Sequence, residues 1–156
     1  MTTAEMKTRD MENSIMPNKA KKCLAETRRQ AHPKCFVCSQ EPDVLGVKFQ
    51  QSTAGGVEAV FDCRAQFEGY PDKLHGGIIA ALLDGAMTNC IFAVGETALT
   101  AEMVVRYKQP VLIGEPAVIR GWIETCSRRL CHTEAALSQG GEVKVTATAK
   151  FISTGA

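Results

Sequence analysis

The chain has 156 residues, the usual size of one domain. Its 18 Lys and Arg residues against 17 Asp and Glu residues give a net charge of +1, which excludes the basic footprint of a nucleic-acid-binding protein. The seven cysteines are odd in number, and the N-terminus lacks a charged start followed by an apolar segment. We therefore expect free thiols in a reducing, cytoplasmic setting.

Residues 1–34 form a polar, charged extension that we expect to be partly helical or disordered. A helix is predicted over residues 19–30, because Ala, Lys, Glu, Arg and Leu favour helix and His32-Pro33 would end it. The composition changes after this segment. Residues 35–156 are predicted to form the folded domain.

The folded part begins with short runs rich in β-branched residues, separated by glycine-containing turns. Residues 44–51 and 57–63 flank Ala54-Gly55-Gly56, which indicates a hairpin. A long apolar helix is predicted over residues 77–94, with Gly95 as its C-terminal stop. Four more strands are predicted after it, over residues 97–108, 117–127, 130–139 and 142–153.

This order contains no βαβ alternation, so an antiparallel sheet is favoured over a parallel one and an α+β fold is predicted. The helix is apolar on nearly every face and must be surrounded. Because it carries Asp84 and Asn89, we interpret it as a core helix and expect no membrane association. A curved antiparallel sheet of about six strands wrapped around one long central helix, the hot-dog architecture, meets these demands. Its exposed edges predict at least a homodimer.

Asp84 is the residue of the helix that most needs an explanation. A carboxylate in an apolar setting is destabilising by several kcal/mol unless it is paired or hydrogen-bonded. Thr88 lies four residues after it and Gly77 seven before it, so the three share one helical face that can open onto a cleft. Two interpretations remain open: a general base, or a buried residue that bonds a nearby backbone group.

The start of the helix offers a second candidate element. Gly76 and Gly77 lie where backbone N–H groups have no intrahelical partner and the helix dipole is positive. One of these N–H groups could hold the oxyanion of an attacked thioester, although a glycine pair can also simply form a tight turn. His75 beside them is assigned a supporting role, with capping as the alternative.

Six segments carry a family resemblance. Residues 75–86 (HGGIIAALLDGA) resemble the helix motif of the PaaI-like hot-dog acyl-CoA thioesterases. Further similar segments, in the same order along the chain, are residues 35–38 (CFVC) with 45–46 (LG), 69–72 (GYPD), and 107–110 (YKQP) with 114–115 (GE). The resemblance covers about residues 33–153. It implies an acyl-CoA substrate and a homodimer or dimer of dimers with its site at the subunit interface.

The resemblance also implies roles for particular residues. Asp84 would be the general base or the nucleophile, and the Gly76 or Gly77 amide of another subunit would polarise the thioester carbonyl. Thr100 occupies a position where relatives often place a Ser or Thr that holds the attacking water; the alternative is an ordinary strand residue. Gly69 departs from some relatives, which have an Asn or Gln six residues before the histidine.

Coenzyme A requires cations for its phosphates and a groove for its pantetheine arm. The candidates for substrate binding are Thr88 and four basic residues expected at strand ends and in a tight turn, Arg106, Lys108, Arg128 and Arg129; the alternative for each basic residue is a solvated edge. Met87 and Phe92 could line an acyl pocket or belong to the core. Coenzyme A is part of the substrate, so no separate cofactor is expected.

Cys35 and Cys38 have the spacing of zinc ligands, and Cys23 and His32 could complete a set of four. A second paired motif is absent, so no metal site is predicted, and whether Cys35 and Cys38 bind a metal stays open. Two other functions are compatible with this sequence. One is a hydratase or dehydratase acting on acyl-CoA, and the other is a non-catalytic acyl-CoA sensor.

Overall fold

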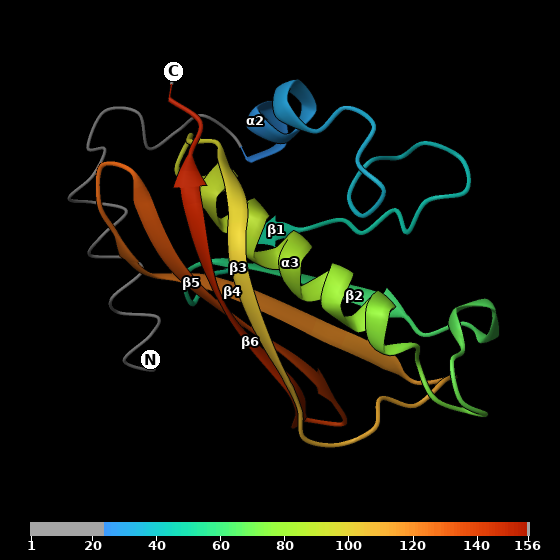
Figure 1. Cartoon of the computed structure of the whole chain (residues 1–156). Coiled ribbons are helices and arrows are strands. Elements are labelled where there is room, and N and C mark those ends of the chain that lie inside the picture. The colour runs from blue at the N-terminus through green and yellow to red at the C-terminus, as the bar shows by residue number, and fades with distance from the viewer. Residues whose placement is uncertain (1–23, 156) are drawn as a thin grey trace.

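The computed structural model of the chain describes residues 24–155 (Figure 1). The predicted long helix and the four strands after it agree with the structure to within one residue at each end. The predicted helix over residues 19–30 is present from Leu24 onward, and residues 19–23 lie outside the described part. The elements in chain order are α2 (Leu24–Ala31), β1 (Gln50–Gln51), β2 (Val57–Asp62), the 3-10 helix η1 (Ala65–Phe67), α3 (Gly76–Ala93), β3 (Ala98–Tyr107), β4 (Pro116–Cys126), β5 (Leu130–Gln139) and β6 (Glu142–Ser153).

The strands form one antiparallel sheet in the order β1-β2-β4-β5-β6-β3. Figure 1 shows this sheet curving around α3, which confirms the predicted α+β hot-dog fold. Buried residues alternate along β2, β4, β5 and β6, as expected where one face of a sheet packs on a helix. The largest of these buried side chains in the sheet include Ile119, Ile123, Leu137, Val145 and Phe151.

The two halves of α3 have different environments. From Gly85 to Ala93 every residue is buried, and α2 packs against the helix in addition to the sheet. Before Gly85, several residues are only half-buried, and Gly77 is exposed. The helix is long and apolar enough to cross a membrane, but 67% of it is buried within the fold, which accounts for its composition. The half-exposed N-terminal half leaves room for a ligand or a partner.

Close contact between α3 and its neighbours depends on glycines at two positions. A Cβ atom at Gly121 in β4 would lie 2.9 Å from the backbone carbonyl of Ala86. A Cβ atom at Gly85 would lie 2.7 Å from Val37 Cγ1 in the loop that crosses the helix. The helix is therefore held between β4 on one side and this loop on the other, at the turn that carries Asp84.

The predicted strand over residues 44–51 is mostly wrong, because only Gln50 and Gln51 belong to the sheet. The residues before them alternate between buried and exposed as a strand does, with Val47 and Phe49 buried. Their backbone, however, bonds the preceding loop: the Val47 N–H donates to the Val37 carbonyl at 2.8 Å. The alternation reflects a segment packed over α3, which a period-two pattern does not distinguish from a strand.

The expectation of free thiols holds for four described cysteines and is wrong for two. Cys126 and Cys131 lie directly opposite each other on β4 and β5 and form a disulfide. The described cysteines that form no disulfide are Cys35, Cys38, Cys63 and Cys90. Burial raises the pKa of the Cys63 thiol to about 11, so this cysteine is a neutral core residue at physiological pH.

Strand β3 lies at the edge of the sheet and is irregular. Its register against β6 shifts between Thr100 and Glu102, which places a β-bulge at Ala101. Most of its residues are exposed, among them Leu99 at 68% and Val104 at 49%. An edge strand that exposes both its backbone and apolar side chains is a natural surface for pairing with another chain.

Candidate active site

Among residues 24–155, the side chain of Asp84 has one hydrogen-bond partner, Thr100. Thr100 on β3 donates a hydrogen bond from its Oγ1 to Asp84 Oδ1 at 2.7 Å. Asp84 is half-buried, whereas Thr88 one turn later is buried. The carboxylate therefore faces β3 and retains access to solvent, and the stabilising contact comes from the strand.

The bulge in β3 decides which of its residues face α3. In a regular strand, Thr100 and Tyr107 would point to opposite faces because seven residues separate them. Here Thr100 pairs with Phe151 and Tyr107 pairs with Val145, two residues that point into the core. The extra residue at Ala101 thus turns both side chains towards the helix.

Tyr107 fixes the start of α3. Its hydroxyl donates to the Gly76 carbonyl at 2.8 Å. His75 is the N-cap of the helix, and its Nδ1 accepts a hydrogen bond from the Gly77 N–H at 2.8 Å. The Gly76–Gly77 peptide is therefore held at both its oxygen and its nitrogen. Among the described residues, none accepts a hydrogen bond from the Gly76 N–H, which leaves it available as a donor.

A groove of about 900 Å³ runs past the start of α3, and its wall is mainly apolar. This volume is within the range of sites that hold a cofactor-sized ligand. Gly76 and Tyr107 both border the groove, so the free N–H lies beside it. The lining residues are Gly69, Tyr70, Lys73, Leu74, His75, Gly76, Ile79, Tyr107, Lys108, Gln109, Pro110 and Val111.

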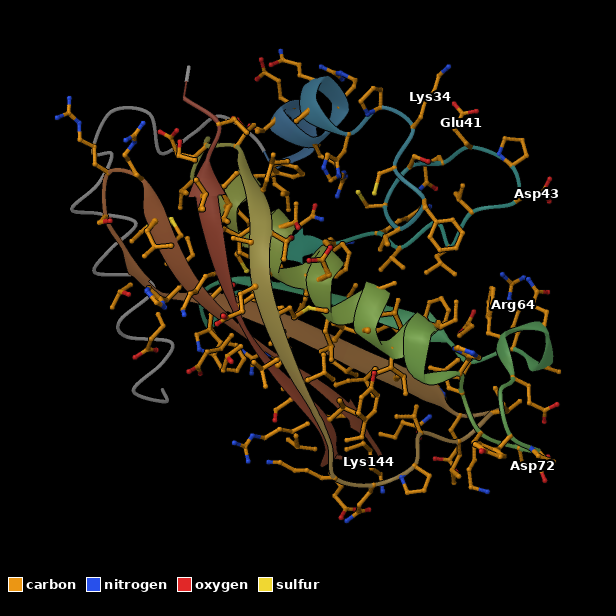
Figure 2. All side chains as sticks on the ribbon, viewed as in Figure 1. Lys34, Glu41, Asp43, Arg64, Asp72 and Lys144 are labelled. Atoms are coloured by element: carbon orange, nitrogen blue, oxygen red, sulfur yellow. A yellow bond between two sulfur atoms is a disulfide. The ribbon has the colours of Figure 1, made fainter. Side chains whose placement is uncertain are left out.

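One rim of the groove is held by a polar cluster. Lys144 Nζ donates to Gln109 Oε1 at 2.8 Å and to Glu142 Oε2 at 2.9 Å. Two hydrogen bonds lower the pKa of the Glu142 carboxyl: the larger effect comes from Lys144 and the smaller from Gln109. Figure 2 shows Lys144 at the end of the sheet where β6 begins. The cluster orders the segment after β3 that forms the groove.

The basic residues expected to contact coenzyme A are distributed over two ends of the sheet. Lys108 lines the groove, and so does Lys73, which the sequence did not single out. Arg106 is exposed and pairs with Thr146. Arg128 and Arg129 lie in the β4–β5 turn, where the Arg129 carbonyl accepts from the Ser153 N–H at 3.0 Å. That turn is at the end of the strands opposite to Lys108.

Asp84 and the glycine pair do not meet within one chain. Gly77 precedes Asp84 by seven residues of the same helix, which corresponds to roughly 10 Å along its axis. A reacting carbonyl must lie about 3 Å from both the attacking group and the oxyanion donor. The two elements are arranged for one site only if they come from different subunits.

Two candidate acyl-pocket residues belong to the core. Met87 and Phe92 are fully buried, and the His32 ring packs edge-on against Phe92 with 4.9 Å between ring centroids. The pKa of His32 is lowered because burial outweighs the opposing effect of the nearby Asp84 carboxylate.

Tyr107 was visible in the sequence only as part of the YKQP segment, and no role was assigned to it there.

Comparison with known families gives a match over residues 72–150 to the model described as thioesterase superfamily. This range includes α3, the glycine pair, Asp84, Thr100 and Tyr107. The chain belongs to the thioesterase superfamily. The family resemblance found in the sequence is thereby confirmed. A search of curated proteins returned no match.

Solved structures of other thioesterase superfamily proteins share this fold. A protein described as a thioesterase superfamily member is 24% identical over 70% of this chain, with a TM-score of 0.66, and this chain spans 57% of its length. A hypothetical thioesterase from Streptococcus pneumoniae, solved with coenzyme A, is 18% identical, with 70% of this chain and 89% of that chain covered and a TM-score of 0.65. A variant of the phenylacetic acid degradation protein PaaI from Thermus thermophilus is 20% identical, with 70% and 94% covered and a TM-score of 0.63.

Proposed function

We propose that this thioesterase superfamily protein hydrolyses an acyl-CoA thioester to a free carboxylic acid and coenzyme A. The observation that carries the proposal is the pair of elements on one face: Asp84 held by Thr100, and the start of α3 with a free Gly76 N–H beside an apolar groove. The coenzyme A bound to the Streptococcus pneumoniae protein supports the choice of substrate class.

The complete site is proposed to form between two subunits. Pairing of two β3 edges about a two-fold axis is antiparallel, so the start of one strand lies beside the end of the other. Thr100 and Asp84 of one protomer would then approach Tyr107 and Gly76 of its partner. The same pairing would bring the Arg128–Arg129 turn of one protomer towards the groove of the other, where it could contact phosphates.

In this site the thioester carbonyl oxygen accepts a hydrogen bond from the Gly76 N–H, which stabilises the oxyanion. Asp84 either takes a proton from a water that attacks the carbonyl carbon, or attacks that carbon itself to form an anhydride that water then opens. In both routes the C–S bond breaks and the thiolate of coenzyme A leaves and is protonated. Thr100 orients the carboxylate through its hydrogen bond to Oδ1.

Replacement of Asp84 tests the proposal. Asp84→Asn keeps the shape of the side chain but removes the base and nucleophile, so hydrolysis should fall by roughly 10²- to 10⁴-fold. The measurement is thiol release from a panel of short, long, aliphatic and aromatic acyl-CoAs. Asp62→Asn, an exposed carboxylate on β2, is the matched control and should retain wild-type turnover.

The same assay separates the other functions. Unchanged turnover in Asp84→Asn would refute the role of this residue. A hydratase would consume an unsaturated acyl-CoA without releasing thiol, and a sensor would bind acyl-CoA with no turnover in any variant. Either result would replace hydrolysis as the function.

A further inference from the structure

A second group of reactive side chains lies outside the proposed thioesterase site. His32, Cys35 and Cys38 follow α2 and occupy the loop that crosses α3. Their ligand-capable atoms all lie within 4.8 Å of one another, and Cys38 Sγ is 3.9 Å from His32 Nδ1. Two residues separate His32 from Cys35, and two more separate Cys35 from Cys38, so one short segment brings three metal-binding side chains together.

Three hydrogen bonds in this turn involve Cys35, two through its backbone and one through its sulfur. The Cys35 N–H donates to the His32 carbonyl at 3.4 Å, and the Ser39 N–H donates to the Cys35 carbonyl at 3.1 Å. The Val37 N–H points at Cys35 Sγ, 3.4 Å away. An amide in this position can also donate a hydrogen bond to the sulfur when the sulfur is bound to a metal, which would hold the ligand in place.

The surroundings exclude solvent from one side of the cluster. Cys38 is 4% exposed, while His32 and Cys35 are half-buried. The His32 ring rests against Phe92 of α3, and the fully buried Asn89 side chain interacts with the Cys38 sulfur. Figure 2 shows Lys34 and Glu41 on the outer side of the loop, whereas Arg28 and Lys48 line the same hollow as His32 and Cys38.

We propose that His32, Cys35 and Cys38 bind one Zn²⁺ ion as a structural site. Tetrahedral zinc, with Zn–S of about 2.3 Å and Zn–N of about 2.0 Å, holds neighbouring ligand atoms roughly 3.5–3.8 Å apart. The distance of 3.9 Å between Cys38 Sγ and His32 Nδ1 already approaches this value, and the other two distances, each at most 4.8 Å, must shorten by at most about 1.3 Å. Two thiolates and an imidazole favour zinc over hard cations such as magnesium or calcium.

Three protein ligands leave a fourth position, which a water molecule or a further side chain can fill. Cys23, the other cysteine considered from the sequence, lies outside the described residues. The site is separate from the acyl-CoA chemistry, since the proposed reaction uses none of these three side chains.

A bound zinc ion would affect the position of the loop that carries Val37. Val37 lies between the two cysteines in sequence and packs against Gly85, the residue after Asp84. Zinc would fasten this loop to the turn of α3 that carries the carboxylate.

The test measures metal content in the full-length chain purified from zinc-supplemented medium, by mass spectrometry of the acid-released metal. About one zinc per chain is expected in the wild type, and little in Cys35→Ser or Cys38→Ser. Cys63→Ser is the matched control, because Cys63 is an equally buried free thiol whose sulfur contacts Gln139 and the Phe61 carbonyl. It should retain the wild-type zinc content.

Cobalt substitution of the wild type gives a second measurement that does not depend on the variants folding. Co²⁺ bound by two thiolates in a tetrahedral site shows thiolate-to-metal charge transfer and intense visible bands. A wild-type chain that holds no zinc after reconstitution, or a cobalt form without the charge-transfer bands, would overturn the proposal. Zinc kept by both Cys35→Ser and Cys38→Ser, or lost equally from Cys63→Ser, would overturn it as well.

Discussion

Asp84 and Thr100 show how a single hydrogen bond orients a carboxylate on an apolar helix. The carboxylate lies on a largely apolar helix, yet it is half-buried and accepts a hydrogen bond from an exposed strand residue. A hydrogen bond to a charged group contributes about 1.5–3 kcal/mol, enough to set the orientation of the carboxylate. Thr100 is thus a positioning residue for Asp84, not merely a residue that favours strand.

Thr100→Val removes the donor while keeping the shape of the side chain. Loss of one hydrogen bond to a charged group predicts a fall in kcat of about 10- to 100-fold, with the melting temperature little changed because Thr100 is exposed. Steady-state kinetics and thermal unfolding are the measurements. Thr100→Ser retains the hydroxyl and should restore most of the activity; equal loss in both variants would show that packing, not the hydrogen bond, is what matters.

At the scale of elements, the site depends on how closely α3 approaches the sheet. Gly121 of β4 lies against the backbone of Ala86, two residues after Asp84. Val37 and Phe49 press on Gly85 from the opposite side. Because the helix is confined on both sides, a side chain added at either glycine must displace backbone or core residues.

Gly121→Ala should therefore lower the free energy of unfolding by about 1–3 kcal/mol, because its Cβ would overlap the Ala86 carbonyl. Urea denaturation followed by circular dichroism measures this change. Gly76→Ala is the matched control, since the added Cβ would lie at an ordinary 3.6 Å from the Tyr107 ring. A stability equal to wild type in Gly121→Ala would contradict the close helix–sheet contact.

At the scale of the whole molecule, one chain contains both halves of the proposed site, but they do not meet within that chain. Asp84 and the free Gly76 N–H lie on the same helix, too far apart to act on one carbonyl. The exposed edge of β3 supplies the surface through which a second copy would complete the site.

A mixing experiment tests shared sites directly. Asp84→Asn and Gly76→Pro should each be nearly inactive. Proline at position 76 removes the N–H that is the proposed oxyanion donor. The backbone can accept it, because His75 has φ −59° and ψ 131°, a conformation compatible with a following proline. Refolding the two variants together should restore activity, because a mixed dimer pairs the intact Asp84 of one protomer with the intact Gly76 of its partner. Half of the dimers are then mixed and each has one intact site of two, giving about a quarter of wild-type activity. Recovery of no activity from a confirmed mixed dimer would mean that each site lies within one chain.

Much of this protein follows from local patterns in its sequence. The continuous apolar run predicted α3, and glycine-containing turns between β-branched runs predicted the hairpins, because helix period and turn chemistry depend on near neighbours. Asp84, Gly76 and Gly77 could be singled out for a similar reason: a carboxylate on an apolar helix and a glycine pair at a helix start are both visible in a few consecutive residues.

Only the tertiary structure decided the features that depend on residues far apart in the chain. The bulge at Ala101 turns both Thr100 and Tyr107 towards α3. Its position depends on the register of β3 against β6, so the residues of β3 alone do not predict it. Residues 44–49 alternate like a strand but bond a loop, and Cys126 meets Cys131 only because β4 and β5 pair in one register. The same holds for His32, Cys35 and Cys38: their spacing was visible in the sequence, but only the fold shows that their side chains converge, since convergence depends on the turn that α3 supports. Local propensity thus determines the elements, while pairing and packing between distant segments determine which side chains meet.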